Sequence, residues 1–199
     1  MIIGVINIKG GVGKTTSSLA IATAAQRSGL SVTVVDTDPQ GSATLWAQAA
    51  EDADDPLPFP VVSKNQADIR RMRERRPDRD GELIVIDTPP NGAVVDEAIK
   101  TADFVVIPTL SSPIDLQQTM LTAAQCQDAG KDYAVLIVMA RKGTNALRAF
   151  RTAVEEYGAG IFDTEIPLRE DFKADFGHTF RSNLNGYEDV WNELRGELR

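Results

Sequence analysis

Residues 6–16 read Ile6-Asn7-Ile8-Lys9-Gly10-Gly11-Val12-Gly13-Lys14-Thr15-Thr16 and follow a short apolar run. Three glycines within four positions let the backbone curl at positive φ and bring successive N–H groups close to an anion. Lys14 would place a positive charge on the β and γ phosphates of a nucleotide. The Thr15 hydroxyl would hold Mg²⁺ at the start of a helix whose dipole also favours phosphate. The stretch is therefore predicted to be a phosphate-binding loop.

Apolar runs of strand length alternate with amphipathic segments along the rest of the chain. This alternation predicts an α/β fold of three layers, the P-loop fold, with a mainly parallel twisted sheet covered by helices on both faces. A length of 199 residues suits a single domain over 1–199. Strands are expected at 1–7, 31–36, 82–87, 104–108, 134–139 and 161–166, and helices at about 14–29, 42–50, 65–76, 115–130, 144–157 and 187–198.

Acidic residues stand where two of these strands end. Asp87 closes the buried run Leu83–Ile86, and Asp36 closes the strand before it, with Asp38 two residues on. Ligands gather at the carboxyl ends of strands in parallel sheets, so these carboxylates and the phosphate loop are expected to meet at one edge. Asp87 is predicted to hold Mg²⁺ through water, because Mg²⁺ sheds its hydration reluctantly.

The phosphate loop departs from the usual pattern in an informative way. The usual loop has glycine at position 8, where this chain has Ile8, and does not require Lys9. The extra lysine followed by Gly-Gly-Val-Gly-Lys-Thr-Thr resembles the deviant phosphate loop of the ParA/MinD family of dimeric ATPases. The resemblance implies ATP/ADP and Mg²⁺ as cofactors, and a Lys9 that reaches across a homodimer formed with ATP to the partner's phosphates.

Further stretches extend the resemblance over nearly the whole chain. Asp36-Thr-Asp38-Pro-Gln40 resembles the first switch segment, in which Asp38 would position the attacking water and Asp36 would lie nearer the metal. The segment 87–92 resembles the second switch, and 166–169 and 139–142 resemble the family's base-facing strand ends. The resemblance thus implies catalytic residues Lys9, Lys14 and Asp38; metal-binding residues Thr15, Asp36 and Asp87; and nucleotide-binding residues Lys9, Gly10, Gly11, Val12, Gly13, Lys14, Thr15, Thr16, Arg141 and Pro167.

The family function favoured by the sequence is DNA partition. The phosphate loop begins at the N-terminus, which resembles the small plasmid-type ParA proteins and leaves no room ahead of it for a helix-turn-helix domain. A slow ATPase is expected, in which the ATP-bound dimer binds DNA non-specifically. A centromere-binding, ParB-like adaptor would stimulate hydrolysis. The expected location is cytoplasmic, associated with the nucleoid when ATP is bound.

Binding to DNA would depend on local basic clusters, because the formal net charge of −8 opposes contact with nucleic acid or an anionic membrane. A solvated helix face is the alternative interpretation of the first cluster, and the surface that meets DNA is left open. The candidate clusters are Arg70, Arg71, Arg73, Arg75, Arg76 and Arg79; Arg141, Lys142, Arg148 and Arg151; and Arg195 with Arg199.

Three other functions share this architecture. A cargo-positioning switch of the MinD kind would need a basic amphipathic C-terminal helix, whereas the segment 187–198 carries several acids, so no membrane partner is expected. An ATP-dependent small-molecule ligase of the dethiobiotin-synthetase type fits Lys9 and the 36–40 segment poorly. The nitrogenase iron-protein branch needs two cysteines per chain, and only Cys126 is present. The single cysteine excludes an internal disulfide and a Cys-rich metal site, and the single histidine, His178, argues against a His-ligated metal.

Overall fold

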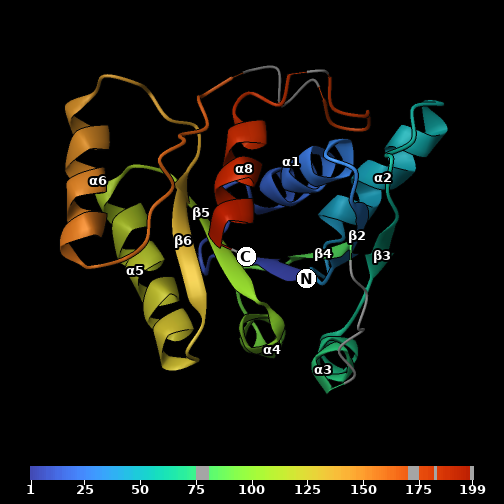
Figure 1. Cartoon of the computed structure of the whole chain (residues 1–199), viewed down its shortest axis with the longest axis horizontal. Helices are drawn as coiled ribbons and strands as arrows, with labels where there is room; N and C mark the ends of the chain where they lie inside the picture. The colour runs from blue at the N-terminus through green and yellow to red at the C-terminus, as the bar shows by residue number, and fades with distance from the viewer. Residues whose placement is uncertain (75–80, 170–174, 182, 198–199) are drawn as a thin grey trace.

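The computed structural model describes residues 1–74, 81–169, 175–181 and 183–197, and shows a parallel sheet between layers of helices (Figure 1). The strands are β1 (Ile2–Val5), β2 (Ser31–Asp36), β3 (Val61–Ser63), β4 (Glu82–Asp87), β5 (Phe104–Thr109) and β6 (Asp132–Ile137). The helices are α1 (Lys14–Arg27), α2 (Ser42–Asp52), α3 (Gln66–Glu74), α4 (Ala93–Thr101), α5 (Pro113–Asp128), α6 (Asn145–Glu156) and α8 (Tyr187–Glu197).

The six strands lie in the order β3-β2-β4-β1-β5-β6, and all the pairs are parallel. The register pairs Val5 with Asp87 and Asp36 with Asp87, so β1, β2 and β4 end level with one another. This alignment brings the phosphate loop and the acids that follow the strands to one edge of the sheet. The predicted three-layer α/β fold is confirmed.

Alternate residues of the strands bury their side chains against opposite helical layers. In β4, Leu83 and Val85 pack in a core with α1, α2 and α8, while Ile84 and Ile86 pack on the other side with α3, α4 and α5. Figure 1 shows α1, α2 and α8 on one face and α3 and α4 on the other. Full burial of each such side chain stabilises the fold by about 1.5–3 kcal/mol, which explains why both faces of these strands are apolar.

The helix ends follow the signals in the sequence. The Thr144 hydroxyl accepts a hydrogen bond of 3.3 Å from the N–H of Leu147 and caps α6 at its start. Gly158 follows the same helix with φ of +77°, a left-handed conformation that costs glycine little. The predicted cap and stop of this helix are confirmed.

Three segments differ from the sequence expectations. The stretch 161–166 is not a regular strand: an isolated bridge joins Ile161 to Val135 of β6, and a second bridge, just beyond both segments, joins Pro167 to Ala140. The short β3 and the helix α4 were not predicted. Three residues after a proline-rich connection carry little pattern, whereas the apolar spacing of Val95, Ala98, Ile99 and Ala102 could have indicated α4 and was overlooked. The ends of the predicted helices 65–76 and 187–198 lie outside the described residues.

Every helix in the described ranges is too short or too polar to cross a bilayer.

Candidate nucleotide-binding site

The phosphate loop curls around a pocket of about 460 Å³ at the carboxyl edge of the sheet. Gly11 and Gly13 have φ of +76° and +73°, which a residue with a Cβ adopts only under strain. Val12 has its side chain buried beneath the loop, so it can offer a ligand its backbone N–H. The pocket is lined by Gly10, Gly11, Gly13, Lys14, Thr15, Thr16, Asp38, Ser42, Trp46, Thr88, Pro90, Met139 and Phe176.

Lys14 lies folded back over the loop. Its Nζ donates a hydrogen bond of 2.8 Å to the carbonyl of Lys9, and the residue is 8% exposed. Burial lowers the pKa of Lys14, while the charges of Asp87 and Asp38 act to raise it. A polyphosphate in the pocket would add negative charge beside this ammonium and offset its desolvation, so the site is suited to an anionic ligand.

Asp87 and Thr15 form a corner of hard oxygen donors beside the loop. The Thr15 hydroxyl donates to Asp87 Oδ2 at 2.8 Å, and the Ser18 hydroxyl donates to Oδ1 at 3.0 Å. Burial raises the pKa of Asp87 to about 7, even though both hydroxyl bonds act to lower it. A carboxylate and a hydroxyl are ligands that Mg²⁺ prefers, and a divalent cation would favour the ionised carboxylate, so the residues fit this metal. Ser18 was missed by the sequence interpretation, although its position one helical turn after Lys14 places it on the same side of α1.

Asp36 and Asp38 have different surroundings although two residues separate them. Asp36 is buried, and its Oδ2 accepts hydrogen bonds from the N–H and the hydroxyl of Thr44, at 2.9 and 2.8 Å. Its Oδ1 accepts from the N–H of Asp38 at 3.1 Å. Asp36 therefore holds the loop onto the start of α2, and its part in a metal site stays a prediction. Asp38 lines the phosphate pocket, where the sequence places the residue that orients water.

Lys9 does not line its own phosphate pocket. Its Nζ forms an ion pair with Asp115 Oδ1 at the start of α5, and the Lys9 side chain is 29% exposed. Burial alone would raise the pKa of Asp115, but the hydrogen bonds from Lys9 and Ser112 outweigh it and hold that pKa below its usual value. The Nζ of Lys9 is thus held by Asp115 beside the phosphate pocket and outside its lining.

A narrower apolar groove continues from the phosphate pocket. It has a volume of about 150 Å³ and shares Gly13, Thr16 and Met139 with that pocket. Its walls come from residues 166–169 and from Tyr187 of α8. Pro167 lies here as expected for a base-facing residue, whereas Arg141 is exposed and lines neither space. Tyr187 was not singled out as a site residue, since its place in the apolar stripe of α8 indicates only burial.

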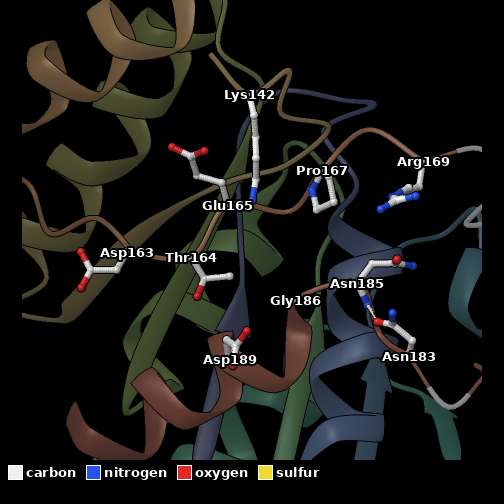
Figure 2. A pocket seen from close by; sticks show the side chains of 10 residues that line it. All are labelled: Lys142, Asp163, Thr164, Glu165, Pro167, Arg169, Asn183, Asn185, Gly186 and Asp189. Carbon is white, nitrogen blue, oxygen red and sulfur yellow. Dashed lines mark hydrogen bonds between the residues drawn. The ribbon is translucent and has the colours of Figure 1, made fainter. Parts of the chain in front are cut away.

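A polar pocket of about 420 Å³ lies beyond Pro167 and Arg169, between residues 163–167 and the turn that precedes α8 (Figure 2). Lys142 and Asp189 line it from opposite sides. It shares Pro167 and Arg169 with the apolar groove, so the segment 166–169 forms a partition between the two spaces.

The basic clusters are only partly available to a partner. Arg71 pairs with Asp68 and Arg73 with Glu97, as expected for a solvated helix face. Arg151 points inward and donates to the carbonyl of Phe162, so it does not belong with the exposed cluster in which the sequence placed it. Residues 75–80 and Arg199 lie outside the described ranges.

Comparison with known proteins settles the family. The model of the CobQ/CobB/MinD/ParA nucleotide-binding domain matches residues 3–179. The chain belongs to this family. This chain is also 30% identical over 179 residues to maintenance of carboxysome distribution protein A from Halothiobacillus neapolitanus. The match covers 86% of this chain and 81% of that protein. The sequence-based assignment to the ParA/MinD family is confirmed.

Solved structures of other proteins have the same fold as this chain. The cell division protein MinD from Aquifex aeolicus superposes with a TM-score of 0.78 at 18% identity, over 98% of this chain and 97% of that one. A plasmid partition protein from Borrelia burgdorferi bound to AMPPNP superposes with a TM-score of 0.75 at 17% identity, over 98% of each chain. At such identities the likeness concerns the fold.

Proposed function

We propose that this chain is a Mg²⁺-dependent ATPase of the ParA/MinD type that positions a large cargo through an ATP-dependent dimer. The observation that carries the proposal is the place of Lys9, partly exposed and outside the phosphate pocket of its own chain. An ammonium in that position can meet the phosphates of a second copy across a shared interface. Lys9 fits the alternative role of a small-molecule ligase poorly.

Each step of hydrolysis has a residue in reach of the pocket. The backbone N–H groups of residues 10–13 and the Lys14 ammonium would hold the phosphates, and Thr15 with Asp87 would hold the metal. The metal would neutralise charge that develops on the phosphates. Asp38, which lines the same pocket, would orient the attacking water. The base would enter the groove beside Pro167 and Tyr187.

The comparisons change the preferred hypothesis about the cargo. The sequence favoured DNA partition with a ParB-like adaptor, and this finer function is not confirmed. The relative with 30% identity is named for carboxysome distribution, which favours the alternative of cargo positioning. We therefore propose a large intracellular assembly as the cargo. Plasmid partition is the second candidate, since the Borrelia burgdorferi neighbour bears that name.

The proposal is tested first with the purified chain. ATP with Mg²⁺ should convert a monomer into a dimer in light scattering, ADP should not, and the dimer should retain duplex DNA in a filter-binding assay. A chain that stays monomeric with every adenine nucleotide and turns over ATP rapidly with a small carboxylate would contradict it and favour the ligase class.

The cargo is tested in cells. Deletion of the gene should leave protein assemblies clustered or mislocalised while plasmid loss rates stay at the level of the parent strain. Plasmid loss with normally distributed assemblies would instead establish the second candidate. An effect on neither would contradict both.

A further inference from the structure

The segment 161–167, which carries the base-facing residues, bonds to β6 at its two ends. At its start the N–H of Phe162 donates to the carbonyl of Val135 at 3.0 Å, and near its end the N–H of Ile166 donates to the carbonyl of Ile137 at 2.9 Å. Between these points the N–H groups of residues 163 and 164 donate to no strand. Their partners come from a helix instead.

Glu193 of α8 accepts both of these donors. Its Oε2 accepts from the N–H of Asp163 at 2.8 Å, and its Oε1 accepts from the N–H of Thr164 at 3.0 Å. One carboxylate therefore accepts from two consecutive N–H groups, which a single neighbouring strand could not do because successive N–H groups of a strand point to opposite sides. Bonds from an N–H to a charged acceptor are stronger than those to a neutral carbonyl, so the contact is well suited to fix an irregular backbone.

Arg151 of α6 holds the same segment through its carbonyl groups. Its Nη1 and Nη2 donate to the carbonyl of Phe162 at 2.9 and 2.6 Å, and Nη2 reaches the carbonyl of Asp163 at 3.4 Å. The guanidinium also lies 4.0 Å from a carboxylate oxygen of Glu165. Two charged side chains from two different helices thus bond to the backbone N–H and carbonyl groups of this irregular segment.

Phe162 and Ile166 bury their side chains in the core, whereas the middle of the segment depends on polar contacts, since the Asp163 side chain is exposed. The pocket of about 420 Å³ lies directly against residues 163–167, between them and the turn before α8 (Figure 2). Side chains that border an open polar pocket supply little packing on that side. Two residues after Thr164 the chain reaches Ile166, where the wall of the base groove begins.

We propose that Glu193 is a positioning residue that sets the base-facing loop 166–169 and thereby the affinity and base selectivity of the nucleotide site. α8 contributes to the site twice, because its first residue, Tyr187, lines the groove and Glu193 holds the backbone that leads into the opposite wall. The inference rests on the proposed function, since it requires that the groove receives the base of the nucleotide.

The test is the variant Glu193→Gln, which keeps the size of the side chain and can accept one of the two N–H groups. Affinities for Mg²⁺-ATP, Mg²⁺-ITP and Mg²⁺-tripolyphosphate are measured by calorimetry. We expect ATP to bind about 3- to 10-fold more weakly and the preference for ATP over ITP to narrow, while tripolyphosphate, which has no base, binds as in the parent. The maximal ATPase rate at saturating ATP should stay within about twofold, so that KM changes and kcat does not.

Glu197→Gln is the matched control, because Glu197 lies one turn further along α8 and is exposed. It should match the parent for all three ligands. The variant Arg151→Gln should resemble Glu193→Gln. The double variant should lose less free energy of ATP binding than the sum of the two single variants, because both side chains hold one segment.

Two results would overturn the inference: equal weakening of ATP and tripolyphosphate binding in Glu193→Gln, which indicates general damage, or unchanged ATP and ITP affinities in a folded variant. Failure of the proposed function is a separate result. It would appear in the parent chain itself, as an absence of ATP binding or as a chain that binds ATP and stays monomeric.

Discussion

Lys9 and Asp115 form an ion pair between the mouth of the phosphate loop and the first turn of α5, across 106 positions of sequence. Asp115 also takes part in the capping box of α5, where it accepts from the N–H and the hydroxyl of Ser112. The ammonium that we propose for contact with a second chain is thus held within its own chain while that second chain is absent. In the proposed dimer, Lys9 would leave Asp115 and contact the phosphates bound to the second chain.

Lys9→Ala is expected to separate nucleotide binding from dimerisation. The substituted side chain does not line the phosphate pocket, so ADP affinity should stay within about twofold of the parent, while ATP-dependent dimerisation should be lost. Light scattering with ATP and calorimetry with ADP measure the two properties. Normal dimerisation with ATP would show that Lys9 makes no contact across the interface.

Asp115→Asn should have the opposite effect on assembly. Without the carboxylate Lys9 loses its partner in the chain, so the protein concentration needed for half-maximal dimerisation with ATP should fall about 3- to 10-fold. Some loss of helix stability, of about 0.5–1 kcal/mol, is expected because the capping box is weakened. Asp128→Asn at the exposed far end of α5 changes the net charge equally and should leave dimerisation unchanged. Weaker dimerisation of Asp115→Asn than of this control would contradict the exchange of partners.

Lys14→Ala and Asp38→Ala should divide binding from hydrolysis. Lys14 lies within the loop that would hold the phosphates, and its removal should abolish measurable nucleotide binding. Asp38→Ala should bind ATP and form the ATP-dependent dimer. Its rate of ATP hydrolysis should be at least about 100-fold lower than that of the parent, as expected when a group that orients water is removed. Equal turnover by Asp38→Ala and the parent would remove Asp38 from the catalytic role, and Asp36 would then be the next candidate.

The central part of the site could be predicted from the sequence because its residues follow directly from the fold. Once residues 10–16 are a phosphate loop after β1, the parallel register places Asp87 level with that loop, and Thr15 meets it at 2.8 Å. Pairings between distant segments carry no such signal. The partner of Lys9 is one acid among many in a chain of net charge −8, and only the packing of α5 beside the loop selects it.

The segment 161–166 shows why an apolar pattern can mislead. Ile161, Phe162 and Ile166 bury their side chains or contact β6 as strand residues would, so the pattern correctly indicates proximity to the sheet. The backbone of the middle residues bonds instead to side chains. Glu193 accepts from their N–H groups, and Arg151 donates to a carbonyl. Likewise Arg151 looks like a member of a basic cluster until its buried carbonyl partner is known.

The stability of the nucleotide-free chain should fall with rising pH through Asp87. Its pKa is raised from 3.8 to about 7 by burial, so between about pH 4 and pH 7 the folded state binds more protons at this carboxyl than the unfolded state. Stability is therefore lost progressively between about pH 4 and pH 7, by roughly 4 kcal/mol as an upper limit, and does not fall further through this group above pH 7. Asp87→Asn cannot ionise and should be about 1–3 kcal/mol more stable than the parent at pH 8, after loss of one accepted hydrogen bond. Urea unfolding of both proteins from pH 4.5 to pH 8 measures this, and curves that stay parallel over the whole range would contradict it.

Tyr187→Phe tests the contact that fixes α8 against the phosphate-loop helix. The hydroxyls of Tyr187 and Ser17 lie 2.8 Å apart, both residues are buried, and burial raises the pKa of Tyr187 well above its ordinary value. Phenylalanine keeps the packing but leaves the Ser17 hydroxyl without this partner, so the free energy of unfolding should fall by about 1–2 kcal/mol. Tyr157→Phe removes an exposed hydroxyl and should change it by less than about 0.5 kcal/mol. Since Tyr187 also lines the base groove, any movement of its ring should weaken ATP binding but spare tripolyphosphate. An unfolding free energy equal to that of Tyr157→Phe would mean that Ser17 finds another partner and that apolar packing alone holds α8 on α1.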